Sequence, residues 1–244
     1  MTIVRWDTGL VSYWRSLYES IRSPDVLWPW FAEHPDLVAE VRELGRPGSH
    51  RIAPGHDLLE RLYALGRVLD LLIADHPRAY PAFCAALGAH RVDRTDFHPF
   101  FHEVAEVRQA ADPGEPPSVV GERWPGFMVG TLLLARAGVV VTAGERHLVA
   151  GVADRSAIYW THHRRHRPAR DLSHGWGHNS QWRTDARRDY LAGGRFHYNV
   201  DGTERPADRA EADLVRHRCG TVTDPGGDLF PYDLRHVEPA MLET

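Results

Sequence analysis

The side chains most capable of chemistry are concentrated in one run, Asp171 to Tyr190, which reads DLSHGWGHNSQWRTDARRDY. The run sets two histidines, several amides and carboxylates and three arginines among two tryptophans and a tyrosine. A surface loop seldom contains so many aromatic rings, and a core strand seldom contains so many groups that demand hydrogen-bond partners. This combination is typical of the wall of a hydrated pocket or of an interface, so we expect the functional site here.

Two histidines in this run, His174 and His178, flank the sequence Gly-Trp-Gly. Because the glycines disfavour a helix, the spacing has no helical meaning, and a turn that approaches a ligand closely is expected. A histidine in such a turn can act as a general base or as a metal ligand, and Asp171 is the nearest carboxylate before it. Asp171, His174 and His178 are therefore the candidate catalytic residues.

The second half of the run supplies groups that can hold an anion. If 181–188 is extended, Arg183 and Arg187 lie on one face, where two guanidinium groups can bind a carboxylate or a phosphate. The structural alternative is that these arginines pair with carboxylates on neighbouring strands. The expected ligand is a small anionic molecule, and the candidate binding residues are Asn179, Gln181, Trp182, Arg183 and Arg187.

A second group, His98, His102 and Glu103, has the residue types of a metal site. We predict a helix over 97–110, in which His98 and His102 are four residues apart and share a face. Two histidines at this spacing can chelate a divalent metal ion, with further ligands from the run described above. The alternative is a half-exposed helix with a capping histidine and no metal ion.

A different class of function also fits these residues. Trp, Tyr and Arg dominate the energetics of protein–protein interfaces, so Trp176, Trp182 and the arginines beside them could form the hot spot of an interaction module, such as a neutralising partner of another protein. The basic segment 162–170 follows two aromatic residues, as on nucleic-acid surfaces. Because the segment is short and the net charge is −4, nucleic acid is the weaker expectation.

The composition excludes several kinds of chemistry. All 29 residues counted as Lys or Arg are arginines. Without lysine there is neither a Schiff base for pyridoxal phosphate nor the lysine of a P-loop nucleotide site. The two cysteines, Cys84 and Cys219, form no CxxC pair, so no disulfide framework and no Cys-rich zinc site is expected. No long apolar run and no secretory signal is found, which predicts a soluble cytoplasmic protein without a membrane partner.

The elements that position these residues begin with a helical part, 1–111. Its longest periodic segment, Asp57 to Ala74, has a broad apolar face and predicts a central core helix. In a shorter helix we expect Cys84 to pack as an apolar residue. The shorter helices are predicted at 10–22, 24–31, 36–44 and 80–89.

After the Pro-rich segment 112–117, the pattern changes to β-branched and alternating runs. Helices followed by strands predict an α+β fold, in which the helical N-terminal half packs on a mostly antiparallel C-terminal sheet, 118–244. Because 112–117 is short, we expect it to be a loop inside one compact domain, 1–244. Strands are predicted at 127–134, 139–142, 147–152, 156–162, 195–200 and 214–222.

Overall fold

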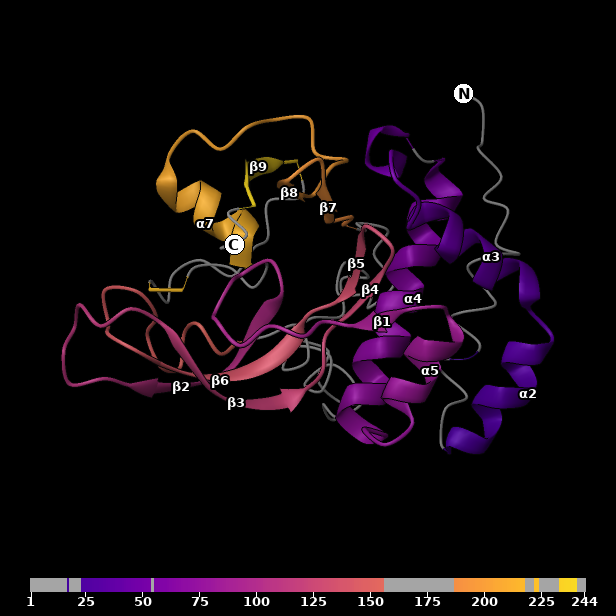
Figure 1. Cartoon of the computed structure of the whole chain (residues 1–244), viewed down its shortest axis with the longest axis horizontal. Helices are drawn as coiled ribbons and strands as arrows, with labels where there is room; N and C mark the ends of the chain where they lie inside the picture. Colours follow the sequence, from indigo (N-terminus) through magenta and orange to yellow (C-terminus); the bar gives the residue numbers. More distant parts are fainter. Residues whose placement is uncertain are drawn as a thin grey trace, which may run out of the picture.

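The architecture is that of an α+β protein, as the sequence predicts (Figure 1). We use a computed structural model, which describes residues 17, 23–53, 55–155, 187–217, 222–223 and 233–240. Within these ranges the helices lie mainly before residue 90 and the strands after it. No helix in the described part of the chain is long and apolar enough to cross a membrane.

The N-terminal helices follow the predicted pattern closely. The described elements are η1 Pro24–Val26, α2 Leu27–Ala32, α3 Pro35–Leu44, η2 Ser49–Arg51, α4 His56–Asp75 and α5 Tyr80–Ala86. Proline occupies the first turn of η1 and of α3, where its missing N–H costs no hydrogen bond. The apolar face predicted for 57–74 is buried in α4 and includes Leu65, Val68, Leu69 and Leu72.

Two sheets follow the helices. The larger has the strand order β1-β4-β5-β7-β8-β9, and all of its pairs are antiparallel. The smaller has the order β2-β6-β3, with β2 parallel and β3 antiparallel to β6. The strands are β1 His90–Arg91, β2 His102–Gln109, β3 Ser118–Trp124, β4 Phe127–Val129, β5 Leu132–Ala135, β6 Ala137–Ala143, β7 Tyr190–Ala192, β8 Arg195–Tyr198 and β9 His236–Pro239.

The N-terminal helices and one last helix, α7 (Arg209–His217), lie on opposite sides of the molecule in Figure 1. Helices α4 and α5 share a core with β4 through Phe83, Phe127 and Val129. Helix α7 contributes Val215 to a separate core with Phe196 from β8. Helices therefore pack against the larger sheet in two places, α4 and α5 near β4 and α7 near β8.

The contact between α3 and the larger sheet depends on glycine. Thr131 N donates to Gly45 O at 2.8 Å, directly after α3. A Cβ atom on Gly45 would collide with the backbone of Val129, and one on Gly130 would collide with Gly45. Gly130 also has a φ of 54°, which favours glycine. This close approach fixes the segment after α3, 46–53, against the sheet.

Four local predictions are wrong. The single strand predicted over 127–134 is a hairpin of β4 and β5, because residues 130–131 form a turn between them. Residues 97–110 do not form a helix, because 98–101 form turns and His102–Gln109 is strand β2. The strand predicted at 214–222 is contradicted at its start, because 214–217 belong to helix α7, while 218–221 lie outside the described residues. Residues 147–152 form turns after β6 instead of a strand. The strand predicted at 156–162 lies outside the described residues, as does most of the helix predicted at 10–22.

The loop 112–117 packs on the end of β6. Gly144 N donates to Glu115 O at 2.9 Å and Arg146 N donates to Pro113 O at 3.0 Å. These contacts agree with a loop inside a compact unit. That the whole chain forms one domain stays a prediction.

Candidate functional site

Most of the run in which the sequence predicts the site lies outside the described residues. This holds for the catalytic candidates Asp171, His174 and His178 and for Trp176. It also holds for the ligand-binding candidates Asn179, Gln181, Trp182 and Arg183. The described end of the run is 187–190, which includes the candidate Arg187.

Arg187 belongs to a buried ion cluster around Asp189. Its Nε donates to both carboxylate oxygens of Asp189, at 2.6 and 2.8 Å. Arg136 Nη2 donates to the same carboxylate at 3.1 Å, and Asn199 N donates to it at 2.8 Å. Burial opposes ionisation of Asp189, but the charges of Arg187 and Arg136 outweigh it and lower its pKa. Arg187 therefore forms part of a buried ion cluster. Its second arginine, Arg136, is the residue between β5 and β6.

The proposed metal trio is arranged differently from the prediction. His98 lies in the turn before β2 and His102 is the first residue of β2, so the two do not share a helix face. The two Nδ1 atoms accept backbone hydrogen bonds: His98 N donates to His102 at 3.0 Å, and Phe100 N donates to His98 at 3.2 Å. Neutral rings that accept at Nδ1 carry their proton on Nε2, the other possible metal-binding atom. Glu103 is buried beside them on β2. In the described ranges, no group of three or more His, Cys, Asp or Glu residues is placed to hold a metal ion.

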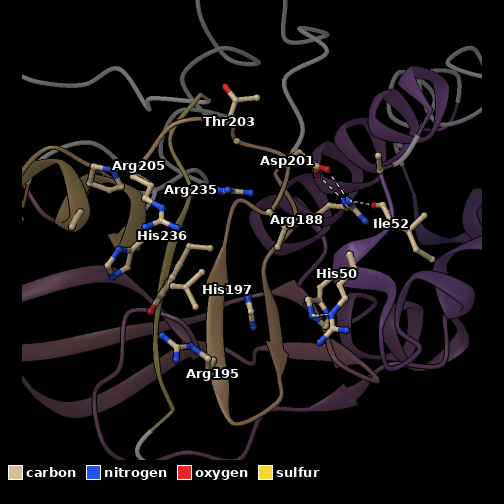
Figure 2. A pocket seen from close by; sticks show the side chains of 18 of the residues that line it. His50, Ile52, Arg188, Arg195, His197, Asp201, Thr203, Arg205, Arg235 and His236 are labelled. Carbon is tan, nitrogen blue, oxygen red and sulfur yellow. Dashed lines mark hydrogen bonds and ion pairs between the residues drawn. The ribbon is translucent and has the colours of Figure 1, made fainter.

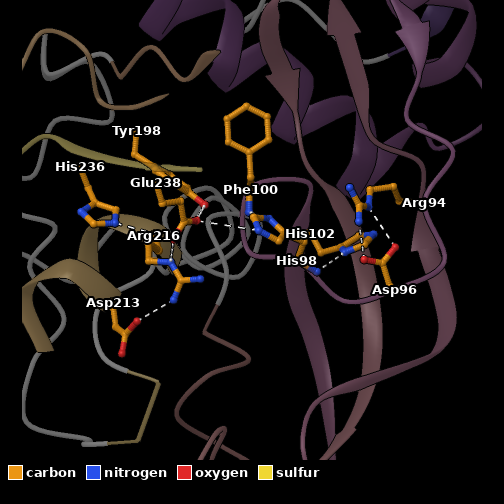
Figure 3. Close-up of polar contacts among 10 residues, drawn as sticks. All are labelled: Arg94, Asp96, His98, Phe100, His102, Tyr198, Asp213, Arg216, His236 and Glu238. Carbon is orange, nitrogen blue, oxygen red and sulfur yellow. Dashed lines mark hydrogen bonds and ion pairs between the residues drawn. The ribbon is translucent and has the colours of Figure 1, made fainter. Parts of the chain in front are cut away.

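The ring of His98 points toward a cluster of polar side chains around the carboxylate of Glu238 in β9 (Figure 3). Tyr198 Oη donates to Glu238 at 2.5 Å, and Arg216 Nε lies 3.0 Å from it. The Nε2 atoms of His98 and His236 lie 3.8 and 3.7 Å from the same carboxylate. Burial raises the pKa of Glu238, but His236, Tyr198 and Arg216 together outweigh this and lower it to about 2. The cluster is an ionised carboxylate that ties β8, β9 and α7 together.

Beside this cluster lies an open, basic pocket with a volume of about 1190 Å³ (Figure 2). One wall, called here the η2 wall, is residues 50–53, which are the end of η2 and the two residues after it. The other wall is the loop 201–208 with the start of α7. Strands β8 and β9 form the floor between the two walls. The arginines, histidines and carboxylates that line it are His50, Arg51, Arg188, Arg195, His197, Asp201, Arg205, Asp208, Arg235 and His236.

Both carboxylates in this lining are already engaged. Asp201 accepts two hydrogen bonds of 2.7 Å from Arg188. Asp208 caps helix α7, where it accepts a hydrogen bond from Glu211 N at 2.9 Å. No ion pair links a described carboxylate to any of the four remaining arginines, Arg51, Arg195, Arg205 and Arg235. The pocket therefore has an excess of positive charge that can attract an anion.

Two histidines meet where the η2 wall reaches the floor. The rings of His50 and His197 have centroids 4.9 Å apart. His197 Nε2 lies 3.2 Å from Ala192 O, and Arg51 Nε donates to His50 Nε2 at 3.3 Å. Burial, the partner ring and the nearby arginines lower the pKa of His50. Burial and the charges of Arg195 and Arg51 lower that of His197, although its contact with Ala192 opposes the shift. Both rings are therefore predominantly uncharged at neutral pH.

Sequence reasoning missed most of this pocket. His50 and Arg51 lie in a segment that reads only as a Pro/Gly/Ser loop, far from β8 in sequence. A partial signal was present in 195–200, because Arg195 and His197 alternate with the apolar or aromatic residues Phe196 and Tyr198. That alternation marks a basic open face.

Comparisons with known proteins do not identify this chain. No family model, curated protein or solved structure matches it.

Proposed function

We propose that this protein binds a small anionic ligand in the basic pocket between η2 and the β8–β9 floor. One observation carries the proposal: four arginines line a single open pocket, and none is ion-paired with a described carboxylate. Guanidinium groups bind carboxylates and phosphates through paired, charge-assisted hydrogen bonds. The ligand class is the one expected from the sequence. The pocket lies beside the end of the predicted run, with which it shares Arg188.

A structural explanation of the same arginines is less satisfactory. Elsewhere in the described chain, partly or fully exposed arginines are often paired, for example Arg91 with Glu122 and Arg94 with Asp96. Four like charges gathered around one cavity repel one another, and this repulsion is relieved when an anion binds. The proposal concerns binding and assigns no reaction. The catalytic hypothesis for Asp171, His174 and His178 concerns residues outside the described ranges.

Isothermal titration with inorganic pyrophosphate and with citrate tests the proposal. We expect saturable binding that weakens as ionic strength rises, because exposed charges are screened by salt. Arg51→Ala and Arg205→Ala should each weaken binding by about tenfold, which corresponds to the loss of one charge-assisted contact. Arg146→Ala removes an exposed arginine from the turn after β6 and serves as the matched control. Absence of binding, or an equal effect of all three variants, would contradict the proposal.

A further inference from the structure

The pocket floor has a repeating pattern that constrains the shape of its ligand. In the β8–β9 ladder, His197 is opposite Val237 and Arg195 is opposite Pro239. Side chains alternate between the two faces of a strand, and directly opposed residues share a face. Arg195, His197 and Val237 therefore lie on one face, which opens to the pocket, whereas the side chains of Phe196 and Tyr198 are buried. Tyr198 and His236, which is opposite it in the ladder, also border the pocket.

The two arginines of this floor lie at opposite ends. Arg235 is four residues before Pro239, the residue opposite Arg195. At a rise of about 3.3 Å per residue, their backbone positions are separated by roughly 13 Å along the strands. Figure 2 shows this order, with Arg195 at one end, His197 between and Arg235 toward the other end. The floor thus has a cation near each end.

The end marked by Arg235 carries a second cation. Arg235 N donates to Glu204 O at 2.9 Å, and Glu204 forms a β-bridge with Leu234. This pairing brings Arg205, the next residue, alongside the segment that holds Arg235. Both side chains are exposed and line the pocket. One end of the floor therefore offers two guanidinium groups and the other offers one.

Apolar side chains are exposed between the two charged ends of the floor. Val237 is 39% exposed, and Ile52 on the η2 wall is 63% exposed, so both leave apolar surface open to the pocket. His197 lies opposite Val237, and its lowered pKa leaves the ring predominantly uncharged at neutral pH. Open apolar side chains between cations are suited to an uncharged ligand body, because covering them releases water.

We infer that the ligand is an elongated molecule with an anionic group at each end and a largely apolar body between them. The inference rests on the proposed anion-binding function and names its ligand class, a bisphosphate or dicarboxylate with end groups on the order of 10 Å apart. One end group lies at Arg195 and the other at Arg205 and Arg235, while Ile52 and Val237 cover the body. The competing arrangement has the arginines bent inward, with Arg51 reaching from the facing wall to clamp a single anion over His197.

Titrations with three synthetic probes separate these arrangements. Octane-α,ω-bisphosphonate presents two anionic groups far apart, methylenebisphosphonate presents them close together, and octylphosphonate has the long body with one anionic group. We expect the octane bisphosphonate to bind at least about tenfold more tightly than either of the others, since it alone engages both ends. Methylenebisphosphonate binding as tightly as the octane compound would overturn the inference in favour of the single clamp.

Variants provide the second arm of the experiment. Arg195→Ala and Arg235→Ala should each reduce the affinity for octane-α,ω-bisphosphonate to about that of octylphosphonate for the intact protein, with Arg146→Ala as the control. Both pocket arginines are exposed, so thermal melts should confirm that the variants remain folded. Octane-bisphosphonate affinities that are unchanged in both variants would refute the two-ended arrangement. If none of the three probes binds the intact protein, the anion-binding function itself fails.

Discussion

Arg188 and Asp201 form a two-point ion pair in the pocket wall, with Nε–Oδ2 and Nη2–Oδ1 distances of 2.7 Å each. The Arg188 side chain is 2% exposed, and its guanidinium also donates to Ile52 O at 2.8 Å and to Tyr190 Oη at 3.1 Å. One side chain therefore joins the η2 wall, strand β7 and the loop after β8. Arg188 positions the pocket wall, whereas the four other arginines of the lining, which pair with no described carboxylate, are the ones that we propose bind the ligand.

We expect Arg188→Ala to lower the free energy of unfolding by about 3–5 kcal/mol, because it leaves the largely buried Asp201 without its partner. Asp201→Asn keeps the size of the side chain and can still accept a hydrogen bond, so it should cost less. Urea unfolding of both variants measures the difference, with Arg146→Ala expected within about 0.5 kcal/mol of the wild type. A wild-type unfolding curve for Arg188→Ala would show that the ion pair does not stabilise the fold.

The helical half was predictable because its signals are local. The apolar face of α4 recurs at helical spacing, and prolines mark the starts of η1 and α3. Helix α7 had a comparable signal that was missed: Asp208 and Glu211 form a reciprocal cap, in which Glu211 N donates to Asp208 and Ala207 N donates to Glu211. Attention to that cap would have predicted a helix in place of the strand at 214–222.

Strand β2 was mistaken for a helix for a different reason. Val104 and Val107 are three residues apart, a spacing typical of one helix face, and both are buried. In a regular strand they would point to opposite faces. The register of β2 with β6 shifts between Val104 and Glu106, and this irregularity restores both valines to the same core. A β-bulge is set by the neighbouring strand, so local periodicity could not reveal it. The pocket was likewise unpredictable as a whole, since His50 and His197 meet only in the fold.

The affinity of the pocket for anions should rise as pH falls. The pKa values of His50 and His197 are lowered in the free protein, so both rings are mostly uncharged at neutral pH. A bound anion favours the protonated rings, raises these pKa values and so couples binding to proton uptake. Sulfate is a suitable probe because its charge is constant over this range. Between about pH 8 and about pH 5.5 we expect its affinity to increase several-fold, up to tenfold per pH unit for each proton taken up.

The double variant His50→Gln with His197→Gln provides the control for this pH dependence. It keeps polar groups at both positions but removes both titrating rings, so its affinity for sulfate should change little over the same range. A wild-type affinity that does not depend on pH would show that the two histidines do not sense the bound anion.

Acid should destabilise the fold in two separate windows. Burial lowers the pKa values of His98 and His102 to about 4, from 6.5. The unfolded state therefore binds protons first, and the free energy of unfolding should fall as pH drops from 6.5 toward 4. Glu238, whose pKa is lowered from 4.5 to about 2, stabilises the fold above pH 4.5, and that contribution is lost as pH falls toward 2.

Urea unfolding at a series of pH values measures the first window. His102→Asn keeps an acceptor for the backbone N–H of His98 but cannot titrate, so its stability should depend less steeply on pH between 6.5 and 4.5 than that of the wild type. The comparison uses slopes, and a general loss of stability in the variant does not affect it. Parallel curves for the two proteins would show that His102 does not contribute to this window.

Cys84 should report on the integrity of the α4–α5 core. Its thiol is free and its side chain is 0% exposed, as expected for a cysteine that packs as an apolar residue. Burial raises its pKa to about 12, against the opposing effect of a hydrogen bond with Tyr80. The reactive thiolate is therefore scarce as well as inaccessible in the folded protein.

In a Cys219→Ser variant, in which Cys84 is the remaining thiol, a chromogenic disulfide reagent should react orders of magnitude more slowly with the native protein than with the protein in urea. Since labelling then requires α5 to separate from α4, its rate should increase with sub-denaturing urea. A native rate close to that of the unfolded chain would mean that Cys84 is accessible and that this core is not packed as described.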